Sequence, residues 1–223
     1  MVFWIAGVAG LGIAYLLGSI PTGYLAGRLL RGIDIREHGS RSTGATNVLR
    51  TLGKGPALAV LLVDVLKGAA AIVVARWVWA WLSTWPSAAP PASDPQAWAP
   101  WAVCLAGLAV LVGHARPVWL NFRGGKSAAT GLGVLLAISW PVGLGAAAVF
   151  GAALAVFRIV SLGSMLAALT AIALACALEQ PLPYRLLVIA GGLYVMARHH
   201  ANIRRLLAGT EPRLGRSSPG PVP

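Results

Sequence analysis

Long apolar runs alternate with short polar segments along most of the 223-residue chain. A helix that crosses the hydrocarbon layer of a bilayer needs about 20 mostly apolar residues. Five runs are of comparable length, and they cover residues 2–27, 56–82, 97–113, 161–178 and 184–197. This pattern predicts an all-α membrane protein, built as a polytopic bundle of transmembrane helices.

A sixth apolar stretch, residues 128–157, has 30 residues, which is long for one span and short for two. Pro141 lies near its middle, and a proline inside a helix breaks or kinks it. We therefore expect two short helices here and seven transmembrane helices in all. A bundle of five remains the alternative.

The basic residues predict how such a bundle is oriented, because cytoplasmic loops carry an excess of Lys and Arg. With the N-terminus outside, the cytoplasmic segments are 28–55, 114–127, Arg158 and 198–223, and they hold 15 of the 18 Lys and Arg residues. Seven spans then leave the C-terminus in the cytoplasm. We expect one membrane domain over residues 1–215, followed by a disordered Pro- and Ser-rich tail at 216–223.

The composition agrees with this class of protein. Apolar residues make up 57% of the chain and charged residues 11%, where soluble domains carry about 25% charged residues. A net charge of +12 could indicate a nucleic-acid binder, but positive cytoplasmic loops explain it better in so apolar a chain. Cys104 and Cys176 both lie within apolar runs, which favours buried thiols over a disulfide or a metal site.

Three polar segments, residues 39–50, 113–131 and 198–211, fall on the cytoplasmic side of this topology. In the second, Gly124 and Gly125 precede Lys126 at the start of an apolar helix. Glycine amides, a helix N-terminus and a lysine can together hold an anion. A plain turn into the helix with a snorkelling lysine is the structural alternative. The segment is not a complete P-loop, because Leu120 stands where that motif has its first glycine.

The first segment offers Ser40 and Asn47, with Arg50 one helical turn further on, where a guanidinium can bind phosphate through two hydrogen bonds. In the third segment His199 and Asn202 share one face of a helix. A neutral histidine there can accept or donate a proton.

Two further features of the sequence narrow the chemistry. Asp64 and Lys67 lie three residues apart inside an apolar run, and a mutual ion pair is favoured over contact with a substrate. The chain has six acidic residues and no cluster that could hold two metal ions, and it lacks the G-x-S-x-G motif of a nucleophilic serine. The sequence therefore favours electrostatic positioning of anionic substrates, with no metal and no cofactor.

The chain resembles the PlsY family of bacterial acyl-phosphate:glycerol-3-phosphate acyltransferases in five blocks that occur in the family's order: GSIPTGYLAGRLLRGIDIREHGS, GATNVLRTLGKG, LLVDVLKG, GHARPVWLNFRGGK and RHHANIRRLLAGTE. The resemblance implies a seven-helix protein of the bacterial inner membrane whose site faces the cytoplasm. It also implies transfer of an acyl chain from acyl phosphate to the 1-hydroxyl of glycerol 3-phosphate, in phospholipid biosynthesis.

By this resemblance the catalytic residues are Ser40, Lys126, His199 and Asn202. Phosphate groups are expected to bind the side chains and backbone of six residues: Ser40, Asn47, Arg50, Gly124, Gly125 and Lys126. The partners implied are acyl phosphate, glycerol 3-phosphate and membrane lipid, with no nucleic acid and no obligate protein partner.

The chain departs from the family pattern at two places. The family usually reads GSGN and GGKGVAT, whereas this chain has Arg41 and Ser42 in the first motif and Ser127 and Ala128 in the second. A transporter of an organic phosphate or another anion is the alternative function, although transporters place their polar groups near the middle of the membrane.

Overall fold

The computed structural model describes residues 2–85 and 95–215, and within them every regular element is helical. In chain order the elements are α1 (Val2–Ser19), α2 (Thr22–Arg31), η1 (Ile35–Glu37), α3 (Ala45–Leu52), α4 (Lys54–Leu82), α5 (Pro95–Ala115), η3 (Val118–Leu120), α6 (Ala128–Ile138), α7 (Trp140–Phe157), α8 (Val160–Ala177), α9 (Leu182–Arg198) and α10 (His200–Leu207). The prediction of an all-α bundle is confirmed. The expected disordered tail lies outside the described residues.

Five stretches in the described part of the chain are long and apolar enough to cross a membrane: Trp4–Arg31, Lys54–Leu82, Gln96–Leu120, Trp140–Phe157 and Val160–Ala177. Helix α6, with 11 residues, and α9, with 17, are shorter apolar helices. The apolar stretch 128–157 is divided as expected. The break lies at Ser139, whose backbone is extended, and Pro141 sits in the first turn of α7, where its missing N–H costs nothing.

The first apolar run is not the single helix expected over residues 2–27. It breaks after Ser19, and Pro21 precedes α2. Lys67 of α4 holds this break by donating from Nζ to the carbonyl of Ile20 (2.9 Å). The same ammonium lies 2.8 Å from Asp64 Oδ1, which also accepts a hydrogen bond from Thr22 Oγ1 (2.7 Å). The expected Asp64–Lys67 ion pair is confirmed, and it fastens α4 to the joint between α1 and α2.

Small residues allow neighbouring helices to approach closely. A side chain at Gly133 of α6 would collide with the carbonyl of Val65 in α4, and one at Gly68 of α4 with the carbonyl of Thr130. Close backbone contact of this kind is how transmembrane helices gain packing energy where lipid is as apolar as the helix surface. Helix α4 therefore lies directly against α6.

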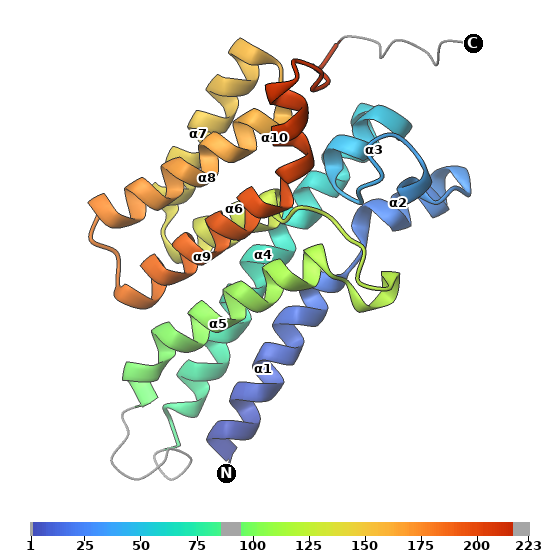
Figure 1. The fold of residues 1–223 in the computed structure, drawn as a ribbon. Coiled ribbons are helices and arrows are strands. Elements are labelled where there is room, and N and C mark those ends of the chain that lie inside the picture. Colours follow the sequence, from blue (N-terminus) through green and yellow to red (C-terminus); the bar gives the residue numbers. More distant parts are fainter. Residues whose placement is uncertain (1, 86–94, 216–223) are drawn as a thin grey trace, which may run out of the picture.

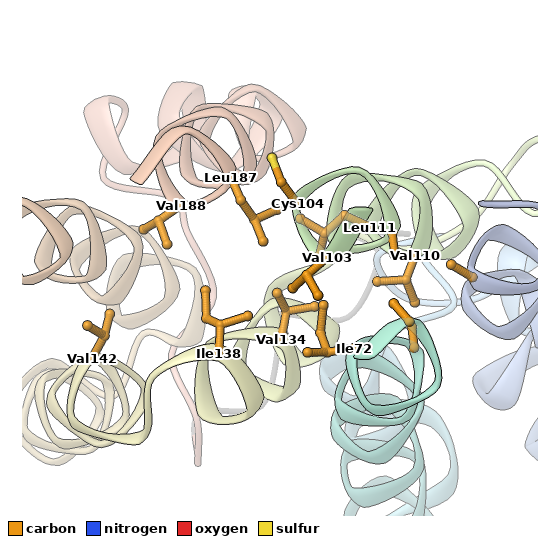
Figure 2. Packing of buried hydrophobic residues seen from close by; sticks show 14 of the residues in the cluster. Ile72, Val103, Cys104, Val110, Leu111, Val134, Ile138, Val142, Leu187 and Val188 are labelled. Carbon is orange, nitrogen blue, oxygen red and sulfur yellow. The ribbon is translucent and has the colours of Figure 1, made fainter. Parts of the chain in front are cut away.

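The buried core extends through most of the helices. Figure 2 shows some of its members on five helices: α4 (Ile72), α5 (Val103, Cys104, Val110 and Leu111), α6 (Val134 and Ile138), α7 (Val142) and α9 (Leu187 and Val188). In Figure 1 the N-terminus of α1 lies at one end of the bundle, whereas α2, α3 and α10 lie toward the other. The core thus fixes the long helices together with α6, and the short helices α2, α3 and α10 lie toward one end of the bundle.

Candidate active site

The three polar segments surround one cavity of about 210 Å³. Ser40 and Arg50 reach it from the first segment, Lys126 from the second, and His199 and Asn202 from the third. Ser40 and Asn202, which lie 162 positions apart in the sequence, thus line the same space. The expectation that these segments form a common site agrees with this geometry.

Lys126 lies at the centre of the site. Its Nζ donates a 2.6 Å hydrogen bond to Asn202 Oδ1, which joins the second segment to the third. Burial lowers the pKa of Lys126 to about 8, although the negative charge of Glu211 opposes this effect. A phosphate group entering the cavity would stabilise the charged lysine, because an opposite charge nearby favours the ionised form.

His199 follows α9 and is 3% exposed. Its Nδ1 lies 2.8 Å from the carbonyl oxygen of Val195. A carbonyl can only accept, so the hydrogen-bond pattern assigns the proton to Nδ1 and leaves a lone pair on Nε2. Burial lowers the pKa of His199 to about 4, and the nearby charge of Lys126 adds to the effect. At neutral pH this histidine is uncharged and able to accept a proton.

Glu211 also lines the cavity, although residue types and spacing did not single it out. Its Oε1 accepts hydrogen bonds from Ser161 Oγ and from Asn202 Nδ2, each 2.6 Å long. Its Oε2 pairs with Arg205 Nε at 2.7 Å. Burial raises the pKa of Glu211, but these hydrogen bonds outweigh burial and leave the pKa lowered. The carboxylate stays ionised and orients Asn202 toward Lys126.

Arg50 and Ser40 present groups suited to an anion. Arg50 projects from α3 into the cavity and, among the described residues, forms no ion pair. Burial lowers the pKa of Arg50 somewhat, and Glu211 partly offsets this. A guanidinium stays protonated through such a shift, and its planar donors match two phosphate oxygens.

The structure gives Asn47 a different role from the expected phosphate contact. Its Nδ2 donates to the carbonyls of Ile35 (2.9 Å), His38 (3.1 Å) and Ser42 (2.8 Å). Its Oδ1 accepts from the amide of Ser40 (2.8 Å). Every polar group of this 1%-exposed side chain is occupied, and Asn47 holds the loop that presents Ser40.

The backbone amides of Gly124 and Gly125, which were expected to cradle phosphate, are also engaged within the protein. The amide of Gly124 donates to the carbonyl of Ala115 and that of Gly125 to the carbonyl of His114, both at 3.1 Å. Neither glycine lines the cavity, whereas Lys126 and the first residues of α6 do. A side chain at Gly125 would collide with the ring of His114. The glycines let the loop press against α5, so the amides left for an anion are those that begin α6.

The two departures from the family motifs occupy the same kind of backbone position. Arg41 and Ser127 both have left-handed conformations, with φ of 57° and 63°. Glycine adopts this region readily, which explains why the family uses it there. Ser127 offsets part of the strain, because its hydroxyl donates a 2.7 Å hydrogen bond to the carbonyl of Leu111. Arg41 is exposed and does not line the cavity.

Two further polar side chains, His114 and Arg198, contact the residues around the glycine loop. His114 Nδ1 is 3.1 Å from Thr130 Oγ1 and 3.6 Å from Asp64 Oδ1, so these buried groups form a polar cluster next to the glycine loop. Arg198 donates to the carbonyl of Gly125 (3.1 Å) and thereby fastens that loop to α9. Within residues 2–85 and 95–215, no three His, Cys, Asp or Glu side chains converge so as to share a metal ion.

Comparison with known proteins agrees with the site. Residues 8–209 match the family model described as glycerol-3-phosphate acyltransferase. A glycerol-3-phosphate acyltransferase 2 of Rhizobium johnstonii is 78% identical over 217 residues, covering 97% of this chain and 99% of that protein. A glycerol-3-phosphate acyltransferase of Acaryochloris marina is 55% identical over 203 residues, covering 91% and 90% of the two chains.

Two crystal structures of PlsY, an integral membrane glycerol 3-phosphate acyltransferase, have a closely similar fold. The glycerol 3-phosphate form superposes with a TM-score of 0.82 at 34% identity, covering 94% of this chain and 96% of that one. The lysophosphatidic acid form has a TM-score of 0.79 and covers 94% and 95% of the two chains. The chain described here therefore belongs to the glycerol-3-phosphate acyltransferase family and is an acyltransferase of phospholipid synthesis.

Proposed function

We propose that the acyl donor is acyl phosphate and that the acceptor is the 1-hydroxyl of glycerol 3-phosphate. The products are then 1-acyl-glycerol 3-phosphate (lysophosphatidic acid) and inorganic phosphate. One observation carries the proposal: a single cavity joins a cationic end, with Arg50 and Lys126, to an apolar continuation between helices. Such a cavity suits two phosphates side by side and one hydrocarbon chain.

The reaction needs little covalent help from the protein, because acyl phosphate is already an activated mixed anhydride. The hydroxyl oxygen attacks the acyl carbonyl carbon, and the carbon–oxygen bond to phosphate breaks with its electron pair leaving on phosphate. Arg50, Lys126 and the Ser40 hydroxyl hold the phosphates and hold the two substrates within reach of each other. Lys126 and the amides at the start of α6 stabilise negative charge on the tetrahedral oxygen and on the departing phosphate.

The hydroxyl proton has two acceptors available, Nε2 of His199 and an oxygen of a substrate phosphate. Replacing His199 with Ala distinguishes them. If the histidine is the base, kcat falls by about 10²-fold or more, since general base catalysis commonly contributes that much. The test measures turnover of purified His199→Ala protein at saturating substrate. A turnover near that of the unaltered enzyme would assign the proton to phosphate.

Labelled glycerol 3-phosphate supplied with either acyl phosphate or acyl-CoA tests the donor. The expected result is labelled lysophosphatidic acid with acyl phosphate alone. Product from acyl-CoA would overturn the proposal. The assay uses the purified chain in detergent, so turnover there also supports an enzyme that needs no protein partner. Uptake of labelled anion into proteoliposomes without any product would instead indicate a transporter.

The proposed topology has seven spans in the bacterial inner membrane, with the N-terminus outside and the catalytic cavity open to the cytoplasm. The basic residues near α2, α3 and α10 support it, because these short helices lie toward one end of the bundle (Figure 1). Single cysteines at position 41 and near residue 85, in a variant without Cys104 and Cys176, test it. A membrane-impermeant thiol reagent should label only the second in intact cells, and the reverse pattern would refute this orientation.

A further inference from the structure

The cavity continues well past the polar residues, between α6, α7, α8 and α9. Its far part is lined by apolar side chains, which include Ala147 and Phe150 of α7 and Ala167 and Ala168 of α8. The polar end and the apolar part are one continuous space. A ligand whose head binds the cations can therefore extend a hydrocarbon tail along these helices.

The length of this cavity follows from the rise per residue of the helices that line it. Ser161 and Ala171 both line it and lie ten residues apart on α8, which corresponds to about 15 Å at about 1.5 Å per residue. His199 and Leu187, at the two ends of the α9 side, lie twelve residues apart, or about 18 Å. A carbon–carbon bond of about 1.5 Å at an angle near 111° advances an extended chain by about 1.25 Å. The whole cavity, polar end included, is thus as long as an extended chain of about 12 to 14 carbons.

The end of the cavity away from the cations is closed by the core. Ala146 and Ala171 form its last lining layer on α7 and α8, and both are 2% exposed. One helical turn beyond them, Val142 and Ala175 are fully buried and do not line the cavity. Figure 2 shows Val142 within the same packed group as Ile138 and Val188. A chain that reaches Ala146 and Ala171 meets packed side chains beyond them.

We infer that this closed end, formed by Ala146 and Ala171 and backed by Val142, determines which acyl chain lengths the enzyme prefers. The inference rests on the proposed reaction in that it assigns the apolar part of the cavity to the donor's acyl chain. The alanines leave room for the last carbons of the chain. A chain longer than the cavity has to bend or leave between helices, and it gains less from burial.

The test compares two leucine substitutions on α8. Ala171→Leu fills the end of the cavity, whereas Ala173→Leu adds the same atoms to an exposed position two residues away. Saturated donors of 8, 12 and 16 carbons are assayed for kcat/KM with each purified variant. Each methylene removed from an apolar site reduces binding about fourfold. Ala171→Leu should therefore lower the 16-carbon to 8-carbon ratio of kcat/KM by about tenfold or more, and Ala173→Leu should leave it unchanged.

A second variant, Val142→Ala, tests the inference independently in case Ala171→Leu does not fold. Val142→Ala removes bulk behind the closed end and should raise the same ratio for the longest donors. If Ala171→Leu and Ala173→Leu give the same ratio as the unaltered enzyme, or if Val142→Ala lowers it, the inference is wrong. The series uses whichever donor, acyl phosphate or acyl-CoA, supports turnover. A failure of the proposed donor would therefore show as a different active donor, separately from the chain-length result.

Discussion

At the scale of single residues, the candidate site contains one lysine, Lys126, whose charge depends on pH near neutrality. Burial sets the pKa of Lys126 near 8 in the empty enzyme, so the side chain loses its proton as the pH rises through that value. A bound phosphate dianion needs the charged form. Binding above pH 8 must therefore include uptake of a proton.

This gives a defined pH dependence. The affinity for glycerol 3-phosphate should be nearly constant from pH 7 to 8 and then fall by about tenfold for each further pH unit, as one linked proton requires. Calorimetric titration at pH 7 to 9.5 measures it. Lys126→Arg is the matched control, because arginine stays charged over this range and should remove the alkaline decline. A decline of equal steepness in Lys126→Arg would assign it to another group.

Asn47 allows a test of the revised role of a predicted ligand. Since its side chain makes four hydrogen bonds within its own loop, Asn47→Ala should lower the free energy of unfolding of the empty enzyme by about 3 kcal/mol. Thermal unfolding in detergent without substrate measures this. Arg50→Ala removes a side chain with no ion pair among the described residues and should leave that stability nearly unchanged. Equal stability of the two variants would contradict a loop-holding role for Asn47 and would favour the expected role as a phosphate ligand.

At the scale of elements, the close contact between α4 and α6 positions two helices that line the cavity. Gly133→Ala would place a methyl group against the carbonyl of Val65, and such overpacking commonly costs about 1–3 kcal/mol. Gly131→Ala, on the same helix, would meet only Leu111 Cδ2 at 3.7 Å, an ordinary contact. The first variant should unfold at a lower temperature and the second should not. Two equal melting temperatures would show that α4 and α6 can move apart without loss of thermal stability.

The elements also show what the sequence could and could not tell. Hydropathy located the long helices, and Pro141 correctly divided residues 128–157. Pro21 carried the same kind of signal, yet the apolar residues around it hid the break between α1 and α2. That break becomes intelligible only with Lys67, whose bond to the Ile20 carbonyl joins positions 47 residues apart. The structure also satisfies the carbonyl of Ala137, near the end of short α6, with Arg76 of α4 (2.7 Å).

For the site, residue types and spacing singled out Ser40, Arg50, Lys126, His199 and Asn202, all of which line one cavity in the structure. They could not separate groups that are free for a ligand from groups already satisfied within the protein, which is why Asn47, Gly124 and Gly125 were assigned to phosphate. They also missed the bond between Ser161 and Glu211, since nothing in either local sequence points to a partner 50 residues away. Such hydrogen-bond accounting requires coordinates.

At the scale of the whole molecule, Glu211 connects parts of the chain that lie far apart in the sequence. It joins Ser161 at the start of α8 to Asn202 and Arg205 of α10, and through Asn202 it reaches Lys126. The amide of Leu214 further fastens this last segment to the carbonyl of Arg158 (2.7 Å). The chain beyond α10 thus completes the hydrogen-bond network that holds Asn202 and Lys126, two of the candidate catalytic residues.

Glu211→Gln tests this long-range connection. Because the charge of Glu211 opposes the lowering of the pKa of Lys126, its loss should bring that pKa below about 8. The alkaline decline in glycerol 3-phosphate affinity should then begin at a lower pH. Titration over the same pH range measures the shift, and Glu179→Gln, a substitution in the turn that follows α8, serves as the control. An unchanged decline in Glu211→Gln would mean that the carboxylate supports only the local fold.

The hydrogen bond of Lys126 to a neutral amide has a consequence for the living cell. The carboxylate nearest to it is already engaged with Arg205, Asn202 and Ser161, so an arriving substrate displaces an uncharged partner and breaks no ion pair. A pocket that is preformed in this way can bind any small tetrahedral oxyanion of similar shape. With acyl phosphate as the proposed donor, the inorganic phosphate that is released should compete for this pocket, and phospholipid synthesis should slow when phosphate accumulates in the cytosol.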